Sequence, residues 1–584
     1  MDRVKCFLCP ILAQKVGEMD HGPLFLLVYK VMAEQMDIPT LLHDEEDNAS
    51  DIDEPCEPIP DPRDEDEDGE DGEESYDISR IIWQENPLGG RTLARNIMDT
   101  PEGLTPYSSG VTSRLHALQL FLTEDILNII LKHTNERFEK EGKEKTNPTE
   151  FMAFLGLIIA MGVTKQNKVN IKNLWEPESL YHMPIFTATM PRVRFNTLLW
   201  GIRFDDKDTR NERLETDRLA ALREVTEILK NNCNMAYVPG PNVTVDERIT
   251  PFRGRCRFRV YMKNKPNKYG IKSWVLCDSS NFYVKNFEIY LGKKDNQREV
   301  KQGLNVVKRL TTVLEKGRNV TCDNFFTSME LAHEMAKQNL TVLGTVRMNR
   351  KEIPDALKPD KNRPLYSSKF LFSKDATMVS YVHKVNKAVV LLSSEHTKRE
   401  VRGPEDDYKP EIIMAYNQRK IGVDLLDSKT KDYTVQRTTC RWTLALFMNY
   451  LDIMLHNAYI IWSKLYEQEE EREDFYKSLI EDMIHDEIQR RINIGFIGIH
   501  ENVQKSIRTA AKVLNLEIQA ASTSQHEAVG HKSSEPSRCY MCEKRNRTRA
   551  KCSKCSNYVC QLHSVRMRLV ICKNCKESIV EHAE

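Results

Sequence analysis

The chain has 584 residues and a formal net charge of −1, and its side chains are 40% hydrophobic and 29% charged, an ordinary composition for a globular protein. At ~100–200 residues per domain, this length predicts about three or four domains. No stretch reaches the ~18 uninterrupted apolar residues that a membrane span needs, so the composition excludes a membrane protein, a collagen-like chain and a small disulfide-stabilised scaffold.

The near-zero net charge conceals a strong segregation of charge. Residues 44–74 carry 18 Asp or Glu and a single Arg, a local charge of −17, which leaves +16 for the rest of the chain. A basic body beside an acidic segment is typical of nucleic-acid-binding proteins. For the acidic segment itself we prefer the simpler interpretation, a solvated and disordered spacer.

Ordered structure is predicted to begin near Leu120. Residues 1–117 comprise a leader without an assigned role, followed by the acidic, disordered region. Thr123 then stands before an acidic first turn and an apolar face, which indicates a helix N-cap. Apolar residues repeat at helical spacing as far as residue 235, so residues 118–235 are predicted to be all-helical.

The pattern changes at residue 240 to an order of three strands, a helix, a strand, a helix and a strand. Residues 350–413 are rich in Lys and Pro, with short strand-like runs, and helices return after them before a Ser-rich linker at 520–538. The predicted strands are 242–249, 272–278, 281–290, 319–322 and 340–346, with 378–385 and 387–392 later, and the predicted helices are 298–316, 328–338, 413–428, 441–465 and 472–493.

Seven of the fifteen cysteines lie in the last 46 residues, where together with His563 they form four pairs, each separated by two residues. Pairs at this spacing suit tetrahedral zinc, because each tight turn brings two ligands to one ion. Disulfides are the alternative, but without a secretion signal a reducing compartment and zinc are favoured. The predicted zinc ligands are Cys539, Cys542, Cys552, Cys555, Cys560, His563, Cys572 and Cys575.

Three aspartates occupy positions at which distant parts of the chain can converge. Asp246 lies on the first predicted strand of the β-rich region, Asp323 follows the fourth, and Asp424 lies in a later helix with Asp427 one turn away. Two Mg²⁺ ions ~3.5–4 Å apart need hard oxygen ligands from separate segments. This is the layout of RNase H-like nucleotidyl transferases, although many aspartates only cap helices or lie in turns.

The residues around these aspartates resemble the piggyBac family of DNA transposases. The resemblance covers roughly residues 118–576, and its blocks occur in the family's order. The four blocks are Thr244–Cys256 (TVDERITPFRGRC), Asn264–Lys272 (NKPNKYGIK), Val320–Ser328 (VTCDNFFTS) and Tyr416–Asp427 (YNQRKIGVDLLD), with Arg441 and Trp442 after the last.

The resemblance implies a multidomain α+β protein with an RNase H-like α/β catalytic core. Asp246, Asp323 and Asp424 would hold Mg²⁺ or Mn²⁺, and Asp427 would assist at the metal site. The implied chemistry is cut-and-paste transposition: nicking at the 3′ ends of an element, hairpin formation and opening, and joining into TTAA sites. The implied partners are double-stranded terminal-repeat and target DNA, bound by a homodimer in the nucleus.

The resemblance also implies how the domains divide the chain. Two of them, the catalytic core and a helical dimerisation and DNA-binding domain, are discontinuous in the sequence. The implied boundaries are 118–240 and 435–515 for the helical domain, 241–349 and 414–434 for the catalytic core, 350–413 for an insertion domain, 516–538 for a linker and 539–576 for the zinc module.

Likeness to piggyBac, RING and PHD zinc modules favours a cross-brace for the eight zinc ligands. Nine residues separate the first two pairs and four separate the second and third, which also favours interleaving, although sequential pairing remains open. In the cross-brace, one site takes Cys539, Cys542, Cys560 and His563, and the other takes Cys552, Cys555, Cys572 and Cys575.

Basic and aromatic side chains near the aspartates are candidates for DNA contact. A run of Lys and Arg follows Asp246, where phosphate contact is favoured over a solvated face. The Trp after Arg441 suits stacking on an unpaired base, and a core position is an equal alternative. The predicted DNA-binding residues are Arg253, Arg255, Lys265, Lys268, Arg441 and Trp442.

Three functions compete for this sequence. The first is an active DNA transposase, and the second is a domesticated derivative that binds DNA or chromatin without transposing. Inverted terminal repeats beside the gene would favour the first. The third is an adaptor or ubiquitin ligase that uses the zinc module, which ranks last because such a protein has no need of the three aspartate blocks.

Overall fold

The computed structural model describes residues 80–88, 96–263, 268–293, 299–466, 470–496 and 499–518, with a few shorter stretches before and after them. The chain divides into two compact units, Met1–Pro55 and Cys56–Glu584. The whole first unit, most of the acidic segment and most of the Ser-rich linker lie outside the described residues. What the sequence predicts for them stays a prediction.

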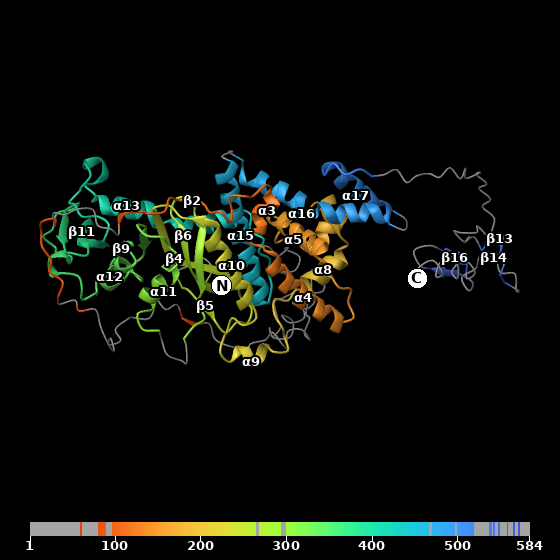
Figure 1. The fold of residues 1–584 in the computed structure, drawn as a ribbon, viewed down its shortest axis with the longest axis horizontal. Coiled ribbons are helices and arrows are strands. Elements are labelled where there is room, and N and C mark those ends of the chain that lie inside the picture. Colours follow the sequence, from red (N-terminus) through yellow and green to blue (C-terminus); the bar gives the residue numbers. More distant parts are fainter. Residues whose placement is uncertain are drawn as a thin grey trace, which may run out of the picture. The chain divides into compact units, whose positions relative to one another are not determined.

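A mixed β-sheet forms the centre of the second unit (Figure 1). Its middle strands lie in the order β7-β6-β4-β8-β9. The strand β6 is antiparallel to both β7 and β4, and β8 and β9 run parallel to β4. The predicted order of strands and helices is confirmed, with one unpredicted short strand, β5, that pairs with β6. The bounds are β4 (Asn242–Pro251), β5 (Arg259–Tyr261), β6 (Tyr269–Asp278), β7 (Val284–Ile289), α11 (Gln302–Thr311), β8 (Asn319–Cys322), α12 (Met329–Lys337) and β9 (Thr341–Thr345).

Successive side chains of a strand point to opposite sides of the sheet. Both faces of this sheet are buried. On one face, Val243 and Val245 pack with the apolar side chains of α11 and α12. On the other, Val275 and Cys277 join the larger core that the helices form. Burial on both faces explains why β6 carries a nearly unbroken run of buried residues.

Three strands from the region after residue 350 extend the same sheet. The strand β12 pairs with β9 in antiparallel fashion, and β11 and β10 follow it outward. This added edge therefore continues the central sheet, and an insertion domain bounded at 350–413 stays a prediction. The strands are β10 (Ser368–Phe372), β11 (Thr377–Lys384) and β12 (Lys387–Ser393).

The region before the sheet is helical, as predicted. Thr123 is the N-cap of α4, but its hydroxyl makes no capping hydrogen bond. The helices are α3 (Arg114–Gln119), α4 (Glu124–Lys140), α5 (Pro148–Val163), α6 (Ile171–Trp175), α7 (Pro184–Thr189), α8 (Arg192–Gly201), α9 (Arg210–Leu214) and α10 (Arg223–Ala236).

The C-terminal helices pack against this region. Among the described residues one helix, α15 (Trp442–Tyr466), is long and apolar enough to cross a membrane, but its side chains are almost all buried inside the protein. It is followed by α16 (Arg472–Ile494), which packs on α5, and α17 (Glu501–Val513), which packs on α7. In Figure 1, α4, α5, α8 and α16 lie on one side of β4 and β6, and β9 and β11 lie on the other.

The prediction of a single helix at 413–428 is wrong in one respect, because the structure has two helices there. The first helix is α13 (Glu411–Arg419) and the second is α14 (Gly422–Asp432). The Thr244 hydroxyl donates to the carbonyl oxygen of Arg419 at 2.8 Å, which satisfies the C-terminal end of α13 and allows the chain to turn before α14.

Candidate active site

Asp246 and Asp323 are brought together by the register of two parallel strands. Val245 of β4 pairs with Cys322 of β8, and the residue that follows each of them in the chain is one of the two aspartates. Ligand oxygens of Asp246, Glu247 and Asp323 all lie within 4.8 Å of one another. Among the described residues, this is the one group in which three metal-type ligands converge.

The electrostatics of this group favour a bound cation. Burial raises the pKa of Asp246 well above its usual range, and the neighbouring carboxylates of Glu247 and Asp323 raise it further. The Glu247 amide donates to Asp246 Oδ1 at 2.7 Å, which opposes that rise. Crowded carboxylate oxygens are the hard donors that Mg²⁺ and Mn²⁺ prefer, so the residues present fit such an ion.

Asp424 and Asp427 both lie on α14, but in different surroundings. Asp424 is exposed in the first turn of the helix and is not a member of the carboxylate group. Asp427 Oδ1 accepts a hydrogen bond from Arg248 Nε at 2.6 Å. In this ion pair the Arg248 side chain is buried and the Asp427 side chain is partly exposed. In this structure Asp427 is therefore engaged by an arginine of β4 rather than turned toward the carboxylates.

Two contacts hold α14 against β4, one before Asp424 and one after it. At the start of α14, a Cβ on Gly422 would lie 2.5 Å from Thr244 Oγ1, so the glycine permits a close approach of helix and strand. One turn beyond Asp424, the Asp427 ion pair holds the helix to β4 again. Asp246 lies midway between the two contact points on the strand, so this register places the turn that carries Asp424 alongside Asp246.

Two side chains at the site were not predicted from the sequence. Glu247 directly follows Asp246, and because side chains alternate along a strand, the sequence suggests that it faces the opposite side of the sheet. In the structure its carboxylate nevertheless lies with those of Asp246 and Asp323. Tyr416 of α13 is buried, and its hydroxyl lies 3.4 Å from Thr345 Oγ1. Burial raises the pKa of Tyr416 to about 12, and the charges of Asp323 and Asp246 add to the rise.

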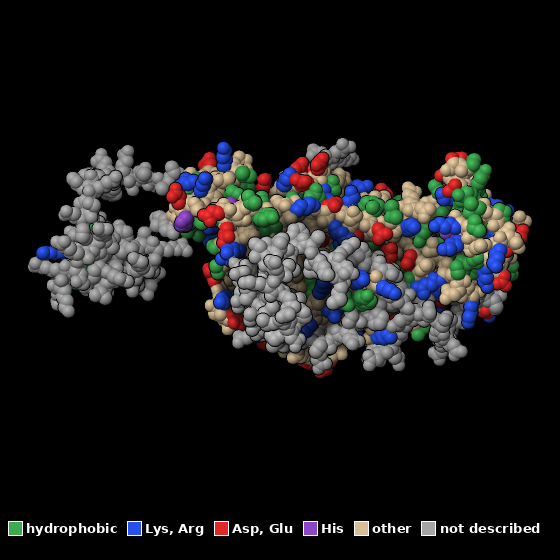
Figure 2. All heavy atoms as spheres, turned by 180° about the vertical axis from the view of Figure 1, so that it is seen from behind, with side chains coloured by type: hydrophobic (Ala, Val, Ile, Leu, Met, Phe, Trp, Pro, Cys, Tyr) green, Lys and Arg blue, Asp and Glu red, His purple; other side chains and the backbone are tan. Residues whose placement is uncertain are grey.

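The predicted phosphate contacts after Asp246 are exposed where the structure describes them. Arg253, Arg255 and Lys268 are exposed, whereas Lys265 lies outside the described residues. Phe252, Cys256 and Phe258 alternate with the arginines and are buried, which directs the guanidinium groups outward. On the face drawn in Figure 2, Lys and Arg side chains are spread over the described surface with Asp and Glu among them.

Arg441 and Trp442 have packing roles in this structure. Arg441 donates to the backbone carbonyl oxygens of Leu199, Trp200 and Ile202, at the end of α8. Trp442 is buried, with its ring edge-on to Phe258 and the centroids 5.1 Å apart. The core interpretation of Trp442 therefore accounts for its packing in the structure, and DNA contact by Arg441 and Trp442 stays a prediction.

The predicted zinc ligands lie mostly outside the described residues. Cys539 is buried, Cys542 is half-buried, and the Cys542 amide donates to the Cys539 carbonyl oxygen at 3.4 Å across a tight turn. The side chains of the other six predicted ligands, Cys552, Cys555, Cys560, His563, Cys572 and Cys575, are not among those described, so zinc binding stays a prediction.

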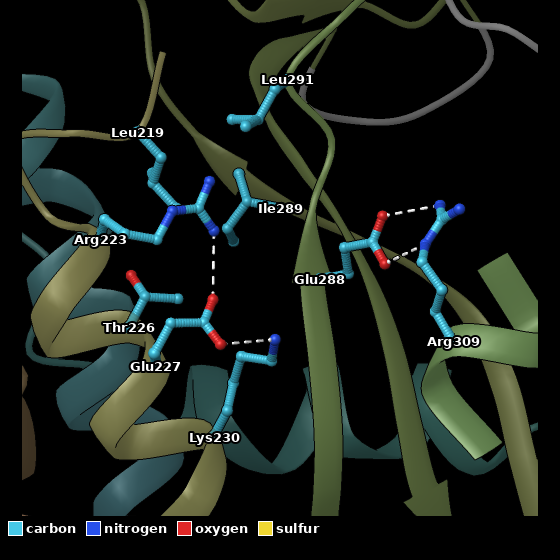
Figure 3. A pocket seen from close by; sticks show the side chains of 9 residues that line it. All are labelled: Leu219, Arg223, Thr226, Glu227, Lys230, Glu288, Ile289, Leu291 and Arg309. Carbon is cyan, nitrogen blue, oxygen red and sulfur yellow. Dashed lines mark hydrogen bonds and ion pairs between the residues drawn. The ribbon is translucent and has the colours of Figure 1, made fainter. Parts of the chain in front are cut away.

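A cavity of about 240 Å³ between α10 and β7 does not supply a second site (Figure 3). Its charged side chains already form ion pairs within the wall. Glu227 pairs with both Arg223 and Lys230, and Glu288 pairs with Arg309. Arg223 and Arg309 also pair with Asp217 and Glu299 beside the lining, so each of the five charged side chains that line the cavity has an opposite charge as its partner.

Comparisons with known proteins agree with this arrangement. The family model described as "Transposase IS4" matches residues 113–459. The human "PiggyBac transposable element-derived protein 3" is 23% identical over 469 residues, which span 75% of this chain and 73% of that protein. The human "Chimeric ERCC6-PGBD3 protein" is also 23% identical over 469 residues, which span 41% of its length.

A solved structure shares both the fold and part of the sequence. It is a piggyBac transposase synaptic complex with hairpin DNA, which is 31% identical, has a TM-score of 0.66, and covers 81% of this chain and 100% of its own. The family model, the relatives and the fold agree with the sequence blocks around Asp246, Asp323 and Asp424. The chain is therefore a member of the transposase family of the piggyBac type.

Proposed function

We propose that the chain is a DNA transposase that cleaves and joins DNA strands by two-metal-ion catalysis. The observation that carries this proposal is the convergence of Asp246 and Asp323 at neighbouring parallel strands, and the close approach of Gly422 to Thr244 supports Asp424 as the third ligand. The strand order β7-β6-β4-β8-β9, with two helical crossovers, supports an RNase H-like catalytic core. The solved transposase complex with hairpin DNA supports DNA as the substrate.

In this proposal, different residues of the chain would bind the metal ions and the DNA phosphates. Asp246, Asp323 and Asp424 would hold Mg²⁺ or Mn²⁺, which would supply activation of an attacking hydroxyl and stabilisation of a leaving oxygen. Exposed Arg253, Arg255 and Lys268 would contact phosphates. Cut-and-paste transposition into TTAA sites, a homodimer, a nuclear location and two zinc ions in residues 539–576 belong to the same proposal.

An excision assay tests the proposal. The full-length chain is supplied with a plasmid that carries the inverted repeats flanking its gene, together with Mg²⁺. Precise excision in wild type and its loss in Asp323→Asn are the expected results. Excision that persists in Asp323→Asn would contradict the assignment of the metal site.

A second candidate is a domesticated protein that binds DNA or chromatin without transposing. The names of the two human relatives favour it, since one is called transposable element-derived and the other chimeric. Under this alternative, the purified chain binds repeat DNA in a gel shift but neither nicks it with Mn²⁺ nor excises it. Absence of flanking inverted repeats would favour the same alternative.

A further inference from the structure

We infer that Arg248 and Asp427 form a clamp that sets the position of Asp424 over Asp246. Asp427 is then a positioning residue, which acts through the helix, and not a metal ligand. This inference rests on the proposed metal site at Asp246, Asp323 and Asp424, and it concerns how that site is assembled from a strand and a helix far apart in the sequence.

The guanidinium group of Arg248 donates hydrogen bonds to two residues of α14. Arg248 Nε donates to Asp427 Oδ1 at 2.6 Å, and Nη2 donates to Thr430 Oγ1 at 2.7 Å. The Arg248 side chain is only 4% exposed and that of Asp427 is 25% exposed. Because the fork of an arginine is planar and rigid, two such bonds fix both the distance and the rotation of the helix relative to the strand.

The spacing of the residues links this clamp to the metal site. Arg248 stands two residues beyond Asp246 on the same face of β4, about 6.6 Å along the strand. Asp427 stands three residues beyond Asp424 on the same side of α14, about 4.5 Å along the helix axis. A shift that breaks the Arg248–Asp427 contact therefore also moves Asp424 relative to Asp246.

The burial of Arg248 argues for a positioning role over a stabilising one. A buried ion pair gains little net stability, because both groups lose water, whereas it restricts geometry strongly. Arg248 also acts on buried Asp452 of α15, whose pKa it lowers against the larger effect of burial. When Asp427 is neutralised, Asp452 still compensates part of the buried charge, so the chain is expected to fold.

A double-mutant cycle on the full-length chain tests the inference, with Mn²⁺ affinity measured by electron paramagnetic resonance. Asp427→Asn and Arg248→Gln are each expected to weaken Mn²⁺ binding roughly tenfold, as is usual for residues that orient metal ligands. If the two act as one clamp, the double variant is expected to lose no more than either single variant. High Mn²⁺ concentrations should also restore DNA nicking in the single variants.

Additive losses would overturn the inference, because they indicate that Asp427 contacts the metal independently of Arg248. Unchanged affinity in both single variants would overturn it as well. Asp432→Asn is the matched control: it breaks the ion pair with Arg472 at the other end of α14 and is expected to leave Mn²⁺ affinity unchanged.

Two further variants keep the result interpretable. Asp424→Asn reports on the metal site itself: if it leaves Mn²⁺ affinity unchanged, the proposed function is wrong, whatever the cycle shows. If Arg248→Gln does not fold by circular dichroism, Arg248→Lys replaces it in the cycle, since it keeps the charge and loses the fork.

Discussion

Val245 of β4 and Cys322 of β8 are register partners in a parallel strand pair, and the residue after each of them is an aspartate. Parallel strands lie about 4.8 Å apart, so equal positions on both strands place Asp246 and Asp323 side by side. The carboxylates meet because each aspartate directly follows a residue of the last register pair of β4 and β8, and this geometry underlies the first two predictions.

Neutralising either aspartate is expected to abolish DNA nicking while DNA binding persists. Asp246→Asn and Asp323→Asn each replace a hard anionic ligand by a neutral amide, so the loss of the nicking rate with Mn²⁺ should exceed the ~100-fold typical of residues that only orient ligands. A gel-based nicking assay measures the rate, and a gel shift measures binding. The exposed Asp360→Asn variant is the control and should nick as wild type does.

The metal-free protein is expected to lose stability as the pH rises through the folded-state pKa of Asp246. Burial raises that pKa above its value in the unfolded chain, so folding favours the protonated carboxyl, and the contribution is full at low pH and lost at higher pH. At pH 7 without divalent ions, Asp246→Asn should therefore raise the melting temperature by a few °C. Melting curves at pH 5 and pH 7 check this, and a larger gain at pH 5 would contradict it.

Trp442→Ala is expected to destabilise the fold, because the indole packs in the core against Phe258. Removal of a buried Trp side chain costs about 3–5 kcal/mol. Urea denaturation should show this loss, and Trp442→Phe should recover part of it. A variant that keeps wild-type stability but loses DNA affinity would instead favour the base-stacking interpretation.

The exposed arginines after Asp246 are expected to act through charge. Arg253→Ala and Arg255→Ala should each reduce the slope of log affinity against log salt by ~0.9 if the side chain contacts one phosphate. Their melting temperatures should stay at the wild-type value, because neither side chain is buried. Fluorescence anisotropy at several salt concentrations gives the slope, and an unchanged slope in both variants would exclude phosphate contact.

Full-length protein is expected to carry about two zinc ions per chain, since eight ligands at two-residue spacing suit two tetrahedral sites. Cys542→Ser should lower the ratio toward one, and truncation after Arg538 should lower it to zero. Metal analysis by mass spectrometry provides the measurement. The exposed Cys440→Ser variant lies outside the module and should keep both ions, and a ratio near zero in wild type would refute the zinc sites.

Local patterns in the sequence were enough to predict the strands that carry the two neighbouring aspartates. The strand β4 begins with Val243 and Val245 alternating with polar residues before Asp246, and β8 is a short run that ends just before Asp323. Such signals depend on a few adjacent residues and on side chains that alternate with a period of two, so they can be recognised without knowledge of the fold. The helices α15 and α16 were predicted for the same kind of reason, a sustained helical period.

The sequence by itself indicated the candidate residues Asp246, Asp323 and Asp424, and the tertiary structure decided how the side chains around them face one another. Arg248 and Asp427 are 179 residues apart, and no local pattern states that one side chain will bind the other. The same holds for Trp442 against Phe258 and for Glu247, whose carboxylate joins Asp246 despite strand alternation. These contacts follow from the register of helices and strands across the core, which long-range packing sets and local periodicity does not contain.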